Sequence, residues 1–524
     1  MKHNMPLALS MIQMIFAATS ATAFLQIPAQ NPATNLRTST IPAPYTKGLL
    51  RSYSNDNDND NDNNDRQIQS DLISLSLPTL ATLSIDPLLS FTDTYFASYA
   101  DSLQAFSVDN LASVATAAPA VNFVLFLFNG VLGTSVVPSV VSRERGSLLS
   151  SSSSSSSDLP PSNSAQLTLR ISFQSGLIIA LAALPILYLL PNPQITLLPQ
   201  LLPILTVRAL TLPFTFSLTT SLSILRGYLD TKTPFKVLAG LGVLNLTLSY
   251  ALTHYFSSSI SGGLAVISAT CLCEILGSYL IYRNLLSASI LPPSFPFSPA
   301  PKTDGVINSV VKRGTSSSFV RSFLLQSFIL SIAYVTSHSS GDPAAISSHQ
   351  VACLIWFLSS FAVDAIGSAA QTMVAEEIGR EGDPKFTADK ALQLGVKAGL
   401  MLSLLTGGFC YGLGGVEALT HGNAAVMEGV ASVLPVVVLC QPLNGAVFVA
   451  DGVLQGANEF DFEAKAMAVS VLLATAFIAL AESQGWQGTT LQHVWEGLAL
   501  LQVSRGAIAL ARIKGIGFVQ SCFI

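Results

Sequence analysis

The chain has 524 residues, of which 50% are hydrophobic and 10% charged, and its mean hydropathy is +0.53. Soluble globular proteins carry about 25% charged residues, so this composition excludes that class. The formal net charge of -5 says little about binding partners, because five of the acids lie in one Asn/Asp tract: Asp56, Asp58, Asp60, Asp62 and Asp65.

The N-terminus has the composition of a targeting leader. Lys2 and His3 precede an apolar stretch, and Ala21-Thr22-Ala23 supplies small residues typical of a signal peptidase site. We therefore expect a signal peptide over residues 1–23. Residues 24–70 have no acid before Asp56 and resemble a transit peptide followed by a disordered spacer. This two-part leader is similar to those of algae with secondary plastids and predicts a plastid envelope or thylakoid membrane. An ordinary secretory-pathway membrane is the alternative.

The rest of the chain alternates long apolar runs with short polar segments. A membrane-spanning helix needs about 20 predominantly apolar residues, and twelve runs approach that length. The predicted spans are Leu72–Phe96, Leu111–Val141, Ala165–Leu190, Leu197–Leu225, Pro234–Phe256, Gly262–Leu286, Phe319–Thr336, Val351–Ala375, Ala391–Leu413, Ala425–Leu454, Ala464–Ala481 and Leu491–Arg512. The fold class is therefore an all-α membrane protein of about twelve transmembrane helices.

The 25 Lys and Arg residues fall in the N-terminal tail, in alternate loops or in helix stretches that mostly abut those loops. Cytoplasmic-type loops carry such an excess, so both termini are expected on one side. The opposite loops and adjoining span ends hold every histidine except His3, which raises the hypothesis of a proton-responsive face. These residues are His254, His338, His349, His421 and His493.

The two halves of the chain echo each other. Gly133-Thr134-Ser135 in span two recurs as Gly367-Ser368-Ala369 in span eight, and Leu225-Arg226-Gly227 after span four recurs as Leu454-Gln455-Gly456 after span ten. We predict two pseudo-symmetric six-helix lobes in parallel orientation, with a substrate site at or near their interface. The N-lobe covers 71–290 with a Ser-rich loop at 146–164, the linker 291–318 and the C-lobe 319–514.

Ionisable residues inside predicted spans are candidates for the functional site, because a charge in the bilayer is costly. A desolvated carboxylate could exchange protons or hold Na⁺ with neighbouring carbonyls, whereas a structural ion pair or a helix cap is the plainer interpretation. Arg208 is predicted to be the only cation well inside. The carboxylates are Asp86, Asp93, Glu274, Asp364 and Asp451.

Several strings around these residues resemble the multidrug and toxic compound extrusion (MATE) transporters, specifically the DinF-like branch. The resemblance extends from about Leu72 to Arg512. The strings are Leu77-Pro78, Asp86-Pro87-Leu88-Leu89-Ser90-Phe91-Thr92-Asp93-Thr94, Val207-Arg208-Ala209-Leu210-Thr211-Leu212-Pro213, Leu225-Arg226-Gly227-Tyr228-Leu229-Asp230-Thr231-Lys232-Thr233-Pro234, Phe361-Ala362-Val363-Asp364-Ala365, Ala369-Ala370-Gln371, Gln441-Pro442-Leu443-Asn444 and Asp451-Gly452.

The resemblance implies a V-shaped pair of lobes that exports organic, cationic or amphipathic solutes in exchange for H⁺ or Na⁺. It implies that Asp93 is the principal ion-linked residue, with Asn245 beside it at a possible Na⁺ site. The family's second acid four residues after that Asn is Ser249 here, which puts direct transfer of the relay in doubt. Asp364 and Asp451 match C-lobe acidic positions. The expected cavity residues are Asp93, Asn245, Asp364, Asp451, Arg208, Asp86, Gln371 and Asn444.

Two other function classes are less well supported. A lipid-linked sugar flippase shares the two-lobe architecture but would be expected to show several basic cavity residues. A membrane enzyme would need a convergent catalytic cluster, and no such motif appears beside a span. The sequence contains no Gly-x-x-x-x-Gly-Lys cradle for ATP. We therefore expect a monomeric, non-enzymatic transporter in the lipid bilayer, without cofactor, firm metal site or nucleic-acid partner.

Overall fold

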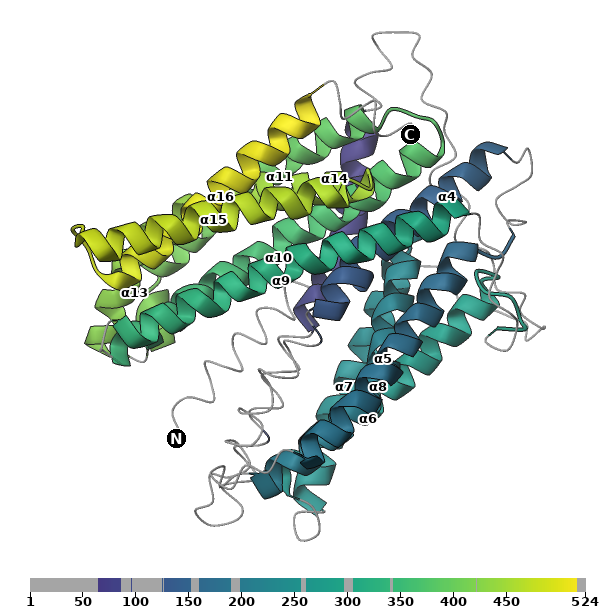
Figure 1. Cartoon of the computed structure of the whole chain (residues 1–524), viewed down its shortest axis with the longest axis horizontal. Helices are drawn as coiled ribbons and strands as arrows, with labels where there is room; N and C mark the ends of the chain where they lie inside the picture. Colours follow the sequence, from purple (N-terminus) through teal and green to yellow (C-terminus); the bar gives the residue numbers. More distant parts are fainter. Residues whose placement is uncertain are drawn as a thin grey trace, which may run out of the picture. The chain divides into compact units, whose positions relative to one another are not determined.

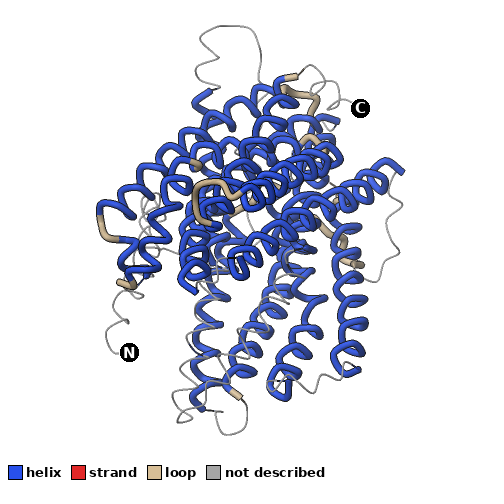
Figure 2. The backbone as a smooth tube through the Cα atoms, turned by 60° about the vertical axis from the view of Figure 1, so that its left-hand side comes forward, coloured by secondary structure: helices blue, strands red, loops and turns tan. Residues whose placement is uncertain are grey.

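The computed structural model describes residues 65–85, 96, 125, 127–151, 160–189, 198–255, 261–295, 305–339, 343–420 and 422–515. All of them belong to the compact unit Gly48–Ile524, which is distinct from the unit Met1–Lys47. The described part consists of helices joined by short loops and contains no strand (Figure 2).

The N-lobe is a bundle in which α6 packs between α5 and α8, and α8 also packs against α7 (Figure 1). Its core joins Val131, Val141 and Leu169 to Leu225 and Ile281. The elements are η1 (Asn129–Val136), α4 (Val137–Ser151), α5 (Asn163–Leu189), α6 (Leu198–Gly227), α7 (Lys232–Tyr255) and α8 (Gly262–Ser287).

The C-lobe has α14 packed against α10, α11 and α16, while α15 packs between α9 and α16 (Figure 1). Two apolar clusters fill it, one around Val449 and Val453 and one around Trp356 and Trp495. The elements are α9 (Gly305–Ser339), α10 (Pro343–Gly379), α11 (Pro384–Gly407), η3 (Gly408–Gly412), α12 (Gly415–Thr420), α13 (Ala424–Leu439), α14 (Gln441–Gly456), α15 (Phe460–Gln484) and α16 (Thr490–Lys514).

Eight helices among the described residues are long and apolar enough to cross a membrane, or nine if α13 and α14 form one bent span. Each overlaps a predicted span over most of its length. Their starts follow the sequence: Asp383 caps α11 ahead of Pro384, and Thr489 and Gln492 form a capping box on α16. Hydropathy and capping residues thus place the helices that carry the site.

The predicted span over Ala425–Leu454, which contains Pro435 and Pro442, is strongly bent. The chain breaks between α13 and α14 with a bend of 53°. Pro442 has no N–H, and its ring would clash with the carbonyl of Val438 in a continuous helix. The freed carbonyls find other donors: Ser403 Oγ bonds to Val438 O at 2.9 Å, and Gln441 Nε2 bonds to Val437 O at 2.9 Å. Side-chain donors therefore replace the helical hydrogen bonds at this break.

Helix α9 starts well before the predicted Phe319, at Gly305, so part of the expected linker is helical. The extra turns are amphipathic rather than uniformly apolar, which explains why a hydropathy criterion misses them. Their buried side packs Val311 against Val136 and Phe460, joining the two lobes. The N-terminal part of α9 is thus an element of the lobe interface.

The predicted repeat is visible in the packing. A Cβ added at Gly227, after α6, would lie 2.9 Å from Val141 Cβ on α4, and one at Gly456, after α14, would lie 2.5 Å from Gln371 O on α10. Equivalent glycines therefore let equivalent helices meet closely in each half.

Basic helix ends meet acidic ends from other helices. Arg512 at the end of α16 pairs with Glu459 between α14 and α15, at 2.7 Å. Lys390 on α11 pairs with Asp65, at the start of the helix over residues 65–85. That helix packs Ile68 and Leu72 into the C-lobe core. These basic residues thus lie at one end of the helix bundle, as the charge pattern predicts. We call the end that carries Lys390 and Arg512 the basic end.

Candidate ion-coupling site and lobe seam

Opposite charges from four C-lobe helices meet inside the bundle. Arg321 of α9 and Arg505 of α16 both pair with Asp451 of α14, and the Arg321 Nη2 to Asp451 Oδ2 distance is 2.6 Å. Arg321 also lies 3.9 Å from Glu463 of α15. Asp451, Glu463 and Arg505 are buried. Buried charges are tolerated only when paired, so this arrangement is interdependent.

Asp364 of α10 and Arg226 of α6 extend this set towards the N-lobe. Asp364 experiences the charges of Arg226, Arg321 and Arg505. Arg226 donates to Ser368 Oγ on α10 at 3.3 Å and to Gly133 O in η1 at 3.2 Å. We call these six residues the ionic cluster: Arg226, Arg321, Asp364, Asp451, Glu463 and Arg505. Three carboxylates balance three guanidinium groups, so a change in any one charge leaves another uncompensated.

A row of buried amides continues from the cluster along α14 and α16. Gln502 Nε2 donates to Asn444 Oδ1 at 3.2 Å, and Asn444 Nδ2 lies 3.5 Å from Gln441 Oε1. Gln502 Oε1 has no hydrogen-bond partner among the described residues. Asn444, predicted to belong to the cavity, is thus fully buried in a polar row beside the break before α14.

The lobes meet in a seam between η1 or α4 and α10. Gln371 Nε2 donates to Ser135 O at 2.6 Å and to Ser139 Oγ at 2.9 Å. Nearer the basic end, Arg145 Nη1 bonds to Glu376 Oε2 at 2.8 Å. Gln371 therefore binds the opposite lobe directly, and the seam is closed at the basic end.

Two glycines let the backbones touch at this seam. A Cβ added at Gly146 of α4 would lie 2.4 Å from Glu376 O, and one added at Gly379 of α10 would lie 2.2 Å from Arg143 O. Tyr228, in the turn between α6 and α7, packs its ring beneath Arg145 at 6.0 Å. Burial and the nearby Glu144 carboxylate raise the pKa of Tyr228 to about 12. The phenol therefore stays neutral at physiological pH.

In the N-lobe, Arg208 of α6 forms an ion pair with Glu274 of α8 at 2.8 Å, and Thr215 Oγ1 donates to Glu274 at 2.6 Å. Asn245 on α7 is fully buried, with Thr270 Oγ1 at 3.4 Å from Asn245 Oδ1. Asn245 Nδ2 and Ser249 Oγ have no hydrogen-bond partner among the described residues. In this lobe the charges of Arg208 and Glu274 are thus paired, whereas Asn245 and Ser249 keep polar atoms without a partner among the described residues.

Comparison with known proteins identifies the family. A family model described as MatE matches residues 318–480. Protein DETOXIFICATION 44, chloroplastic, of Arabidopsis thaliana is 25% identical over 450 residues, covering 84% of this chain and 81% of the relative. DETOXIFICATION 45, chloroplastic, from the same plant is 25% identical over 474 residues, covering 85% and 78%. Along most of its length the chain is thus similar to the MATE family.

The fold agrees with solved MATE structures. An outward-facing multidrug resistance MATE family transporter of the MOP superfamily matches with a TM-score of 0.71 and 16% identity, over 87% of this chain and 96% of that one. A MATE transporter of Vibrio cholerae gives 0.72 and 16%, over 86% and 97%. The predicted all-α membrane fold is confirmed. The MATE proteins that this chain resembles are transporters, not enzymes.

Among the predicted MATE site residues, Asp86 and Asp93 lie outside the described residues. Phe96, three residues after Asp93, contacts Tyr250 of α7 with ring centroids 6.4 Å apart. No group of three His, Cys, Asp or Glu side chains that could hold a metal occurs in the described part of the chain. A sodium site at Asp93 and Asn245 therefore stays a prediction.

The prediction that Arg208 is the only cation well inside this MATE chain is wrong. Arg321 and Arg505 are also enclosed, with 14% and 6% of their side chains exposed. Arg321 was predicted to flank the basic linker, because the apolar run that marks this span starts only at Phe319. Had the helix been predicted to start at Gly305, Arg321 would have been placed several turns inside it and therefore within the bundle.

Proposed function

We propose that this MATE protein is a secondary active antiporter that exports organic solutes in exchange for H⁺ or Na⁺ by alternating access. The ionic cluster is the observation that carries the proposal. It puts three acids where water is scarce and links them through Arg226 to the opposite lobe. An ion that binds to the cluster thus acts on the Arg226 to Ser368 contact between the lobes, which must change when the lobes move.

The energetic coupling follows from the charge balance. Protonating one carboxylate, or placing a cation beside it, leaves a guanidinium group uncompensated in the bundle. Removing one partner of a buried pair costs roughly 3–5 kcal/mol. A ligand shifts a conformational equilibrium only by its difference in affinity for the two states. A difference of roughly 3–5 kcal/mol is enough to shift the equilibrium between two arrangements of the lobes.

The seam is the part of the structure that we expect to alternate between a closed and an open state. The interlobe hydrogen bonds described above join η1, α4 and α6 to α10 at or towards the basic end. Breaking them would open the molecule at that end, and the glycine contacts show that the closed arrangement is tightly packed. Rocking of one lobe on the other about a site near their interface is the expected mode of transport.

Transport from proteoliposomes with imposed pH or sodium gradients tests the proposal, using a panel of organic cations and anions. Asp451→Asn, Asp364→Asn and Asp93→Asn should each be compared with Glu428→Gln, an exposed acid on α13. We expect loss of gradient-driven accumulation in one or more Asp variants and none in the control. Wild-type rates in all three Asp variants would end the proposal.

A flippase for lipid-linked precursors is the second candidate. The observation in its favour is that Arg226, Arg321 and Arg505 supply the multiple cations that the sequence seemed to lack. Their charges are balanced by acids, which favours ion coupling over binding of a pyrophosphate. Vesicles loaded with a fluorescent polyprenyl pyrophosphate sugar distinguish the two, because translocation of that lipid without an ion gradient supports the flippase.

We further propose assignment to the DinF-like branch and a location in a plastid envelope or thylakoid membrane. The transit-like leader supports this location, and the relatives DETOXIFICATION 44 and 45 are both described as chloroplastic. Imaging a C-terminal fluorescent fusion tests the location. Fluorescence confined to the endoplasmic reticulum or plasma membrane would contradict it.

A further inference from the structure

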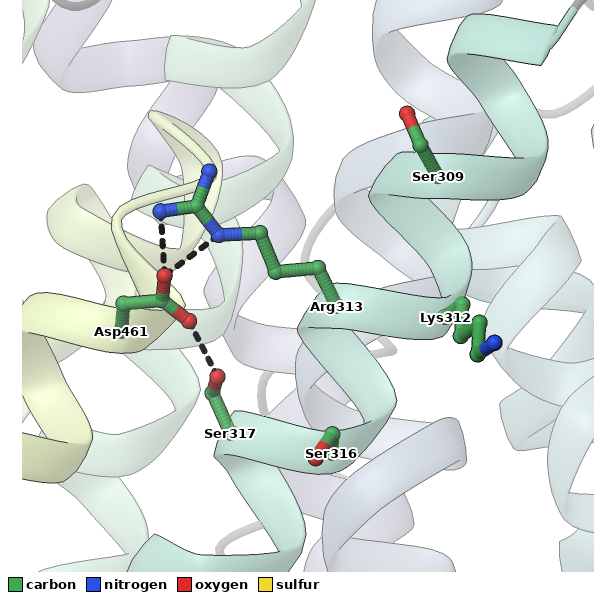
Figure 3. A pocket seen from close by; sticks show the side chains of 6 residues that line it. All are labelled: Ser309, Lys312, Arg313, Ser316, Ser317 and Asp461. Atoms are coloured by element: carbon green, nitrogen blue, oxygen red, sulfur yellow. Dashed lines mark hydrogen bonds and ion pairs between the residues drawn. The ribbon is translucent and has the colours of Figure 1, made fainter.

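An open pocket lined by serine and charged residues lies at the basic end between the first turns of α9 and the start of α15 (Figure 3). Its volume is 480 Å³, within the usual range of about 300–1,000 Å³ for ligand sites. It lies outside the ionic cluster and shares no residue with it. The lining residues are Ser309, Lys312, Arg313, Ser316, Ser317 and Asp461.

The pocket has an excess of positive charge. Asp461 is already engaged, because Arg313 and Ser317 both donate to its carboxylate (Figure 3). The charge of Lys465, one turn along α15, also acts on Asp461. Lys312 and Lys465 are exposed. Arg313 and Lys465 thus act on Asp461, and Glu459 also acts on Arg313 but is itself paired with Arg512. Lys312 lines the same pocket with no acid paired to it in the described part of the chain, so the pocket favours an anion.

The same face of α9 becomes apolar beyond the pocket. Lys312 and Ser316 are followed, at helical spacing, by Val320 and Phe323, each 47% exposed. Leu330 and Tyr334 continue the exposed face at 57% and 62%. A polar, basic end followed by an exposed apolar stripe along a membrane-spanning helix matches an amphiphile with an anionic head and hydrocarbon chains.

We propose that this pocket binds the phosphate-bearing headgroup of an anionic membrane lipid, with Lys312 and Arg313 as cations and the exposed Ser316 hydroxyl as a donor. The acyl chains lie along Val320 and Phe323. Basic pockets between transmembrane helices on the positive side of a membrane are suited to such headgroups. The site is adjacent to the Val136, Val311 and Phe460 contact between the lobes, and an occupant would bridge α9 and α15 beside that contact.

The test is lipid binding by the purified full-length chain in neutral detergent, followed by native mass spectrometry and thermal melting. The probes are phosphatidylglycerol, phosphatidylcholine and inorganic phosphate. We expect Lys312→Gln to weaken phosphatidylglycerol binding about fivefold, the factor that one basic residue near a membrane surface contributes. Lys236→Gln, which removes an exposed lysine from α7 at the same end, should leave it unchanged.

A second variant distinguishes a lipid headgroup from free inorganic phosphate as the ligand. Phe323→Ser should lower retention of phosphatidylglycerol without changing the response to inorganic phosphate. Equal binding of both lipids, an unchanged Lys312→Gln variant, or stabilisation by inorganic phosphate equal to that by phosphatidylglycerol would each overturn the proposal. The measurement involves no transport, so its outcome is independent of the proposed antiport.

Discussion

The closed seam predicts that one added methyl group at Gly146 will open it. A Cβ there would lie 2.4 Å from Glu376 O, whereas real Cβ contacts below 3.0 Å are essentially never seen. The α4 and α10 backbones must therefore separate by at least 0.6 Å, the difference between those distances. Neither backbone can rotate away as a flexible side chain would.

Overpacking of this kind costs about 1–3 kcal/mol. The cost applies only to the state in which the seam is closed, so the equilibrium shifts towards the open state by roughly 5–150-fold. The separation also weakens the Arg145 to Glu376 and Gln371 to Ser135 hydrogen bonds. Gly146→Ala should thus fold normally but populate the state open at the basic end.

Distances between spin labels on Lys232→Cys and Lys385→Cys measure this shift, because both side chains are exposed at the basic end, one in each lobe. The native cysteines are first replaced. We expect longer distances in Gly146→Ala and wild-type distances in Gly240→Ala, since a Cβ at Gly240 meets no atom within 4 Å. Identical distance distributions in wild type and Gly146→Ala would refute the reasoning.

Two further predictions concern stability. Asp451→Asn and Arg505→Gln should each lower the apparent Tm markedly, because each leaves the buried ionic cluster with one uncompensated charge, at a cost of up to roughly 3–5 kcal/mol. The double variant restores the charge balance and should recover part of the loss, and additive losses would contradict direct pairing. Ser403→Ala removes the donor to Val438 O and should destabilise the chain by about 1–3 kcal/mol. Thr247→Ala, whose hydroxyl is exposed and bonds within its own helix, is the control, and melting curves without a difference would exclude a role for the Ser403 bond.

The sequence was sufficient to predict the apolar helices of the described part and the internal repeat, because hydropathy and charged loops are local properties. It placed Asp364 and Asp451 inside spans but did not show their partners. Arg321 lies 130 residues before Asp451, and their meeting depends on how α9 and α14 rotate about their axes, which no local pattern records. Pro442 stands in the sequence as a kink position, but the donor that compensates the break does not, since it is Ser403, 35 residues from Val438.

The stability of the Pro442 break and the placement of the charges are also connected. Bending of a helix concentrates where an interior proline interrupts its ladder. Helix α14, which begins at Gln441, carries Asn444 and Asp451, while α13 is anchored separately through Val430, Val433 and Leu434. The predicted span over Ala425–Leu454 therefore bends near its middle, and any tilt of α14 about this bend would reposition Asn444 and Asp451 together without unfolding α13.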